Sequence, residues 1–146
     1  MSKIVNLLTI TSIIILLIVA CQSEPVLEKI SIEFHNEGEV FETGEFQTFR
    51  VELKDKAGER LEVDDVKIHI NMERMNHPMI GTMNLSEDGV YEVELPLAMA
   101  GEWYTEITLT EEGEERVERF YLQAEGEMAE EFMRGYHADT GEVPEP

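Results

Sequence analysis

The sequence predicts an all-β domain, an antiparallel sandwich of about seven strands in two sheets. Short runs in which apolar and polar residues alternate recur through residues 26–124, and turn signals such as Asp88-Gly89 separate them. No long helical periodicity lies between these runs, which argues against a parallel sheet with crossover helices. Trp103 is the largest side chain on the apolar face of its run, so we expect it in the core.

The first 20 residues have the features of a signal segment rather than of the fold. Lys3 precedes an almost unbroken apolar run over residues 7–19, which is short for a membrane-spanning helix but typical of a signal peptide. The run ends in Ile18-Val19-Ala20-Cys21, which resembles a bacterial lipobox, where a signal peptidase cuts before a lipidated cysteine. The alternative is an uncleaved anchor helix with an incidental cysteine.

Cys21 is the only cysteine, so no disulfide can form within the chain. We therefore expect a lipoprotein signal peptide at residues 1–20, lipidation of Cys21, and a lipidated tether at residues 21–25. Two or more acyl chains give a stable anchor, so the predicted location is the extracytoplasmic face of the cell membrane.

The alternating runs are the predicted strands of the domain at residues 26–124. The clearest alternation places Val66, Ile68 and Ile70 on one face, whereas the run at 79–85 is weak. The last run is less regular, and we expect a bulge near Arg119-Phe120. The predicted strands are residues 30–34, 49–53, 66–72, 79–85, 91–95, 103–109 and 117–123.

The pattern changes in residues 125–146. Met128, Phe132, Met133 and Tyr136 fall near one face of a helix, so we expect a short helix that ends at about Gly135. This helix would dock on the sandwich or on a partner. Residues 138–146 are polar and include two prolines, which predicts a disordered tail.

Composition excludes several classes of function. The chain has 146 residues, with 32 acidic against 11 basic side chains and a formal net charge of −21. A field of this sign repels nucleic acid and attracts cations or basic partners. No nucleophile motif, zinc-protease motif, calcium loop or phosphate-binding glycine loop occurs, so we expect no enzyme activity.

Residues 72–83 carry four of the eight methionines and one of the four histidines. Thioether and imidazole groups are soft to borderline ligands that suit copper, especially Cu(I). The alternative is that these methionines fill gaps in a small core; Met72 lies on the core phase of its strand. The predicted copper ligands are Met75, His77 and Met79, and Met72, Met83 and Met99 are further candidates.

The middle of the domain contains, in order, Ile68-His69-Ile70-Asn71-Met72, Met75, Met79, Asp88-Gly89-Val90-Tyr91, Leu95-Pro96-Leu97 and Met99-Ala100-Gly101-Glu102-Trp103. This order of motifs resembles the YtkA-like family, which includes FixH-type proteins. The resemblance implies an immunoglobulin-like sandwich, and the family is associated with copper delivery and cytochrome oxidase assembly. Two hypotheses follow: a membrane-anchored lipoprotein that binds or delivers Cu(I), or a metal-free interaction module that contacts a membrane protein complex.

Overall fold

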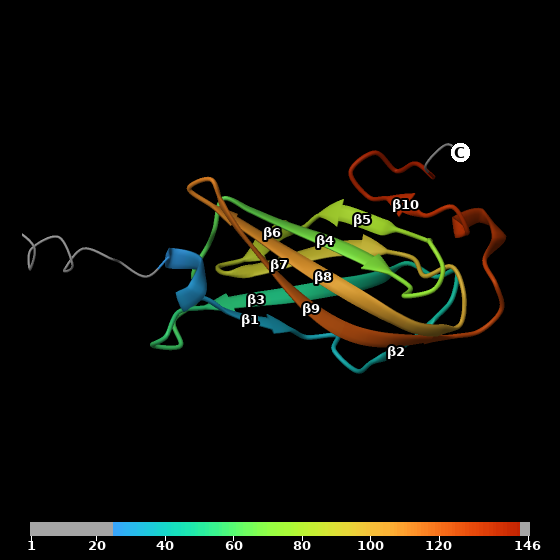
Figure 1. The fold of residues 1–146 in the computed structure, drawn as a ribbon, viewed down its shortest axis with the longest axis horizontal. Helices are drawn as coiled ribbons and strands as arrows, with labels where there is room; N and C mark the ends of the chain where they lie inside the picture. Colours follow the sequence, from blue (N-terminus) through green and yellow to red (C-terminus); the bar gives the residue numbers. More distant parts are fainter. Residues whose placement is uncertain (1–24, 144–146) are drawn as a thin grey trace, which may run out of the picture.

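The computed structural model describes residues 25–143 and has the architecture of a two-sheet β-sandwich (Figure 1). The first sheet has the strand order β1-β3-β7-β6, and the second has the order β10-β5-β4-β8-β9-β2. The strands of the first sheet are β1 (Ser31–Phe34), β3 (Gln47–Lys54), β7 (Val90–Leu95) and β6 (Asn84–Glu87). Those of the second are β10 (Tyr136–His137), β5 (Met79–Thr82), β4 (Asp65–Asn71), β8 (Gly101–Glu111), β9 (Glu114–Glu125) and β2 (Val40–Glu42).

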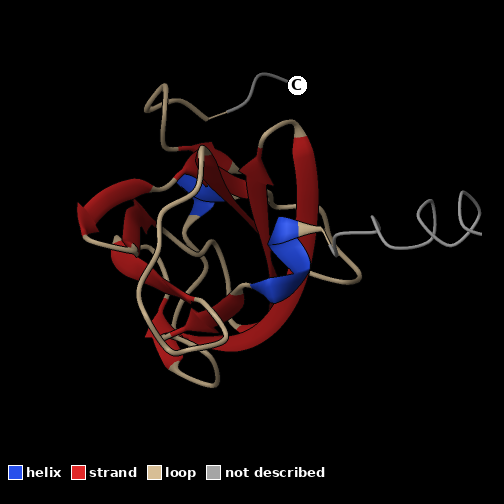
Figure 2. Ribbon diagram, turned by 90° about the vertical axis from the view of Figure 1, so that its left-hand side faces the viewer, coloured by secondary structure: helices blue, strands red, loops and turns tan. Residues whose placement is uncertain are grey.

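Neighbouring strands are antiparallel except at the two edges of the second sheet, where β2 pairs with β9 and β10 pairs with β5 in parallel. Two short 3-10 helices complete the fold, η1 (Val26–Lys29) and η2 (Glu130–Phe132). In the view along the long axis, the strands surround one interior (Figure 2). The predicted all-β sandwich is therefore confirmed.

The core forms because alternate residues of each strand face the space between the sheets. In β4 and β8 these are the positions that the sequence pattern identifies, and Trp103 is only 1% exposed. Phe34, Phe41 and Phe49 join the same buried cluster from β1, β2 and β3. One hydrophobic core thus holds both sheets together.

The predicted strand at residues 79–85 is two strands that belong to different sheets. β5 pairs with β4 in the second sheet, whereas β6 pairs with β7 in the first. The chain crosses between the sheets at Met83, which is buried and donates its main-chain N–H to the carbonyl of Val66. The alternation continues through Met83, so the sequence pattern does not reveal the crossing. The bulge expected near Arg119-Phe120 is absent, because the register between β8 and β9 runs without a shift.

The C-terminal segment is less helical than the sequence predicts. Its helix is limited to the three residues of η2, and the chain then extends as β10 alongside β5. Residues 138–143, expected to be disordered, follow a defined path in which the N–H of Gly141 donates to the carbonyl of His137. We call residues 126–139 the C-terminal strap.

Different helices and loops lie at the two ends of the sandwich. η1 lies at one end, and the loop between β4 and β5, the loop between β7 and β8, and η2 lie at the other (Figure 1). Cys21 and the predicted signal peptide lie outside the described residues. Within residues 25–143, no helix has the length and apolar character needed to span a membrane.

Candidate metal-binding site

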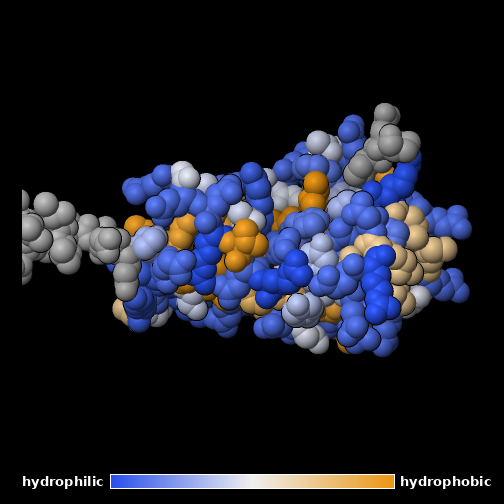
Figure 3. Space-filling model, viewed as in Figure 1, coloured by the Kyte–Doolittle hydropathy of each residue, from blue (hydrophilic) through white to orange (hydrophobic). Residues whose placement is uncertain are grey.

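Methionine side chains gather at the end of the sandwich opposite η1, which we call the methionine end. Met72 and Met75 lie in the loop after β4, and Met99 lies in the loop before β8. The hydropathy surface has weakly hydrophobic side chains at this end of the molecule (Figure 3). Met72, Met99 and Met133 are partly buried and pack against the core, whereas Met75 is 44% exposed.

The side chain of Asn71 closes the loop between β4 and β5. Its Oδ1 accepts hydrogen bonds from the main-chain N–H groups of Met72, at 2.9 Å, and His77, at 2.8 Å. Its Nδ2 donates to the side chain of Asn76. Asn71 is buried, so these bonds satisfy polar groups that would otherwise lose their partners on folding. The loop thereby holds His77 at its base, next to the core.

The His77 ring has one bound nitrogen and one free nitrogen. Nδ1 lies 2.5 Å from the main-chain carbonyl oxygen of Met133. Because a carbonyl can only accept, Nδ1 carries the hydrogen, and in the neutral ring Nε2 keeps its lone pair. Nε2 is buried and has no hydrogen-bond partner among residues 25–143. The ring centroid lies 6.4 Å from that of Trp103, so the His77 ring lies near the indole at the methionine end.

This arrangement matches the way proteins prepare a histidine to bind a metal. A metal-binding histidine usually donates its other ring N–H to a carbonyl or a carboxylate, which fixes the tautomer and the ring orientation. An unpaired buried polar atom otherwise costs about 1–3 kcal/mol. The thioethers of Met72 and Met99, in loops at the same end of the sandwich, are soft donors of the type that suits Cu(I).

The structure separates the predicted ligands Met75, His77 and Met79. Met75 is exposed, His77 is buried under the strap, and Met79 is fully buried on β5, where it faces the core. Met83 is also in the core, at the crossing between the sheets. These two core positions correspond to the gap-filling alternative for methionine.

Met72 and Met99 contact the start of β8. The Cε of Met72 lies 2.8 Å from the point where a Cβ would stand on Gly101. The carbonyl of Met99 accepts a hydrogen bond from the indole N–H of Trp103 at 3.0 Å.

The sequence analysis did not identify Asn71 and the carbonyl of Met133 as parts of the site. Met133 is 56 positions from His77, so no local spacing could have indicated their contact.

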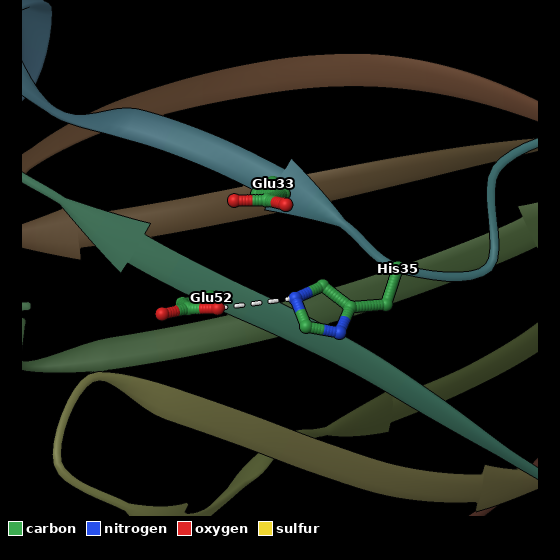
Figure 4. Close-up of side chains that lie close together, drawn as sticks. All are labelled: Glu33, His35 and Glu52. Atoms are coloured by element: carbon green, nitrogen blue, oxygen red, sulfur yellow. Dashed lines mark hydrogen bonds and ion pairs between the residues drawn. The ribbon is translucent and has the colours of Figure 1, made fainter. Parts of the chain in front are cut away.

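A second group of possible ligands lies on the first sheet. Ligand atoms of Glu33, His35 and Glu52 lie within 4.8 Å of one another (Figure 4). However, Lys54 Nζ lies 2.7 Å from Glu33, and Arg60 Nε lies 2.6 Å from Glu52. The Arg60 hydrogen bond also lowers the pKa of Glu52. A metal ion would have to displace both cations, so we interpret this group as an ion-pair network on the sheet surface.

Fold and site together define a small β-sandwich domain with a soft-donor cluster at one end. The sequence model of the YtkA-like family matches residues 26–110, and the chain belongs to this family. No curated protein matches the sequence. The family match ends before β9 and the strap, so Met133 lies outside it.

Solved structures support the fold alone. An endo-beta-1,4-mannanase from Thermotoga petrophila aligns with 74% of this chain at 10% identity and a TM-score of 0.52, although the aligned part is only 22% of the mannanase chain. The Lin-41 filamin domain aligns with 70% of this chain and over 98% of its own length, at 17% identity and a TM-score of 0.51. Salmonella alpha-2-macroglobulin aligns with 68% of this chain at 20% identity and a TM-score of 0.50, over 6% of its own length.

Proposed function

We propose that this protein is a lipoprotein, anchored outside the cytoplasmic membrane through Cys21, that binds Cu(I) at its methionine end. The observation that carries the proposal is the buried Nε2 of His77, which has no hydrogen-bond partner in the described part of the chain. It lies at the end of the sandwich to which the loops bring Met72 and Met99. One imidazole nitrogen and two thioether sulfurs are the proposed donors.

The donor types favour Cu(I) over other cations. Cu(I) is bound well by soft thioether ligands, whereas Zn(II) is usually held by four ligands that include cysteine or histidine. Cys21 is the only cysteine, and it is the predicted lipid attachment site. The net charge of −21 raises the local concentration of cations but does not select copper. Met75 is exposed on the loop between β4 and β5, where it is placed to contact an arriving ion first.

The position of the anchor determines which end of the domain would lie near the membrane. Cys21 precedes η1 by five positions, and a segment of that length spans at most about 18 Å. The η1 end would therefore lie close to the membrane, while the methionine end is at the opposite end of the strands (Figure 1). A protein that exchanges copper with this site, such as a cytochrome oxidase complex, would meet it from the side away from the anchor.

The test is a Cu(I) competition titration of residues 22–146 against a chromogenic chelator. His77→Asn keeps an N–H donor at the position of Nδ1 but has no counterpart of Nε2. We expect this variant to bind Cu(I) at least tenfold more weakly, which corresponds to about 1.4 kcal/mol. His69→Asn, on the outer face of β4, is the matched control and should bind like the parent. A parent domain without affinity for Cu(I) would favour the metal-free interaction module instead.

A further inference from the structure

The C-terminal strap is bound to the domain by main-chain hydrogen bonds. The N–H groups of Tyr136 and Ala138 donate to the carbonyls of Pro78 and Ile80, at 2.9 and 2.8 Å. Ala129 donates to the carbonyl of Ala98, in the loop before β8, at 2.7 Å. The strap therefore extends the second sheet by one short strand and covers both loops of the methionine end.

Close packing makes this docking specific. A Cβ on Gly135 would stand 2.4 Å from the carbonyl oxygen of Pro78, and the residue has a φ of +104°. Only glycine allows the strap to approach the loop so closely in that conformation. Farther along, the carboxylate of Asp139 accepts hydrogen bonds from the main-chain N–H of Thr82, at 2.7 Å, and from its hydroxyl, at 2.9 Å.

Aromatic contacts add to the same docking. The ring of Phe46, which precedes β3, makes edge-to-face contacts with Phe132 and Tyr136 at centroid distances of 5.7 and 5.2 Å. Edge-to-face aromatic pairs stabilise a contact beyond the effect of the apolar area that they bury. Phe46 thus contacts η2 and the start of β10, on either side of Met133.

We propose that the strap positions His77 for the copper site and covers it. This inference rests on the proposed function. The carbonyl of Met133 holds the hydrogen on Nδ1 and leaves the lone pair on Nε2, where a soft cation would bind. Without this carbonyl, the hydrogen could move to Nε2, and the ring in that tautomer could not bind a metal through it.

The strap also controls access to the lone pair. Nε2 is enclosed, so an ion cannot reach it while every surrounding element stays in place. The loop between β4 and β5 is closed by the side chain of Asn71. The strap is attached at β5, at the loop before β8 through Ala129, and against the ring of Phe46. Because the carbonyl on Nδ1 belongs to the strap, lifting of the strap uncovers the His77 ring and admits the ion, and its return restores the tautomer that binds it.

The experiment uses the mature chain and the variant Gly135→Ala, in which the added methyl group overlaps a main-chain oxygen and prevents docking as described. Gly141→Ala is the matched control, because Gly141 also has a positive φ, of +69°, but its Cβ would have no neighbour closer than 4.0 Å. Without metal, NMR chemical shifts of the ring nitrogens report the His77 tautomer. Hydrogen exchange of the Tyr136 and Ala138 amides reports docking.

We expect the parent and Gly141→Ala to hold His77 in the Nδ1–H tautomer with protected amides. Gly135→Ala should lose this protection and show a mixture of tautomers. If half of the molecules carry the wrong tautomer, Cu(I) affinity falls about twofold, while Cu(I) association becomes faster because the cover is absent. Weaker binding together with faster uptake distinguishes positioning and covering from a merely structural role.

The inference is overturned if the parent carries its hydrogen on Nε2, or if Gly135→Ala keeps protected amides or a pure Nδ1–H tautomer. It is also overturned if Gly135→Ala leaves both the affinity and the association rate unchanged. A parent that shows the expected tautomer and protection but binds no Cu(I) would contradict the proposed function, not the role of the strap in holding His77. The two failures therefore give different results.

Discussion

The indole nitrogen of Trp103 donates a hydrogen bond of 3.0 Å to the main-chain carbonyl of Met99. The largest side chain of the core therefore also fixes the loop before β8, which carries one of the proposed copper ligands. The indole ring also lies near the ring of His77, with the two centroids 6.4 Å apart. Core packing and site geometry are linked through this one residue.

Replacement of Trp103 by alanine should destabilise the domain by about 3–5 kcal/mol, because it removes a fully packed aromatic side chain and leaves a cavity. Urea unfolding followed by circular dichroism measures the change. Tyr121→Ala, an aromatic residue on β9 that is 57% exposed, should change the stability by only about 0.5 kcal/mol. Equal effects of the two substitutions would contradict the assigned core.

Stability should fall in acid as the ion pairs of the sheet surfaces are lost. The hydrogen bond from Arg60 holds the pKa of Glu52 below its ordinary value of 4.5, and Arg119 lowers the pKa of Glu106 in the same way. A carboxyl group with a lowered folded-state pKa binds fewer protons in the folded chain than in the unfolded chain. Its stabilising effect is therefore complete above pH 4.5 and decreases as the pH falls through the folded-state value.

Urea titrations of the parent and Glu52→Gln between about pH 3 and pH 7 test this expectation. The variant should be less stable than the parent at neutral pH, and the difference should shrink in acid. Glu94→Gln, an exposed position on β7, controls for the loss of one negative charge. An acid response that is identical in parent and Glu52→Gln would show that the Glu52–Arg60 pair does not contribute.

The sequence predicted the sandwich because one face of most strands is buried, which leaves a clear alternation in runs such as residues 66–72. It did not predict β2 and β10, which are three and two residues long and thus too short for a period to appear. It also missed the crossing at Met83, where the residue that changes sheets is itself buried.

Only part of the site could be predicted from the sequence pattern. Residue types in the segment 72–83 indicated soft donors, but alternation alone could not say which methionines face the core and which lie at the loops. His77 acquires its free nitrogen through a carbonyl at position 133, and that contact depends on the path of the strap. Contacts between distant segments of this kind leave no periodic signal in a single sequence.

Replacement of Cys21 by serine should release the domain from membranes or leave an uncleaved precursor. Serine lacks the thiol that receives the lipid, and the acyl chains contribute about 0.8 kcal/mol per buried methylene group to membrane binding. Membrane fractionation and gel mobility of the parent and Cys21→Ser measure both outcomes. The matched control is Ser23→Ala, two positions away. Unchanged fractionation and mobility of Cys21→Ser would mean that the lipoprotein assignment is wrong.

Four of the five buried or partly buried methionines among residues 25–143 should differ in their importance for copper. Met72 and Met99 are the proposed ligands at the methionine end, whereas Met79 and Met83 face the core. Leucine has nearly the volume of methionine, so each Met→Leu substitution should cost less than about 1.5 kcal/mol of stability. The sulfur is lost in every case, and only the copper affinity should distinguish the positions.

We expect the double variant Met72→Leu/Met99→Leu to bind Cu(I) at least tenfold more weakly than the parent, about 1.4 kcal/mol, in the chelator competition. The double variant Met79→Leu/Met83→Leu is the matched control, because it removes the same number of sulfurs from the core and should bind like the parent. The opposite ranking would place the copper beside Met79, which the sequence analysis predicted as a ligand together with Met75 and His77. Equal and undiminished binding by both double variants would exclude thioether ligation at these four positions and leave His77 without its proposed partners.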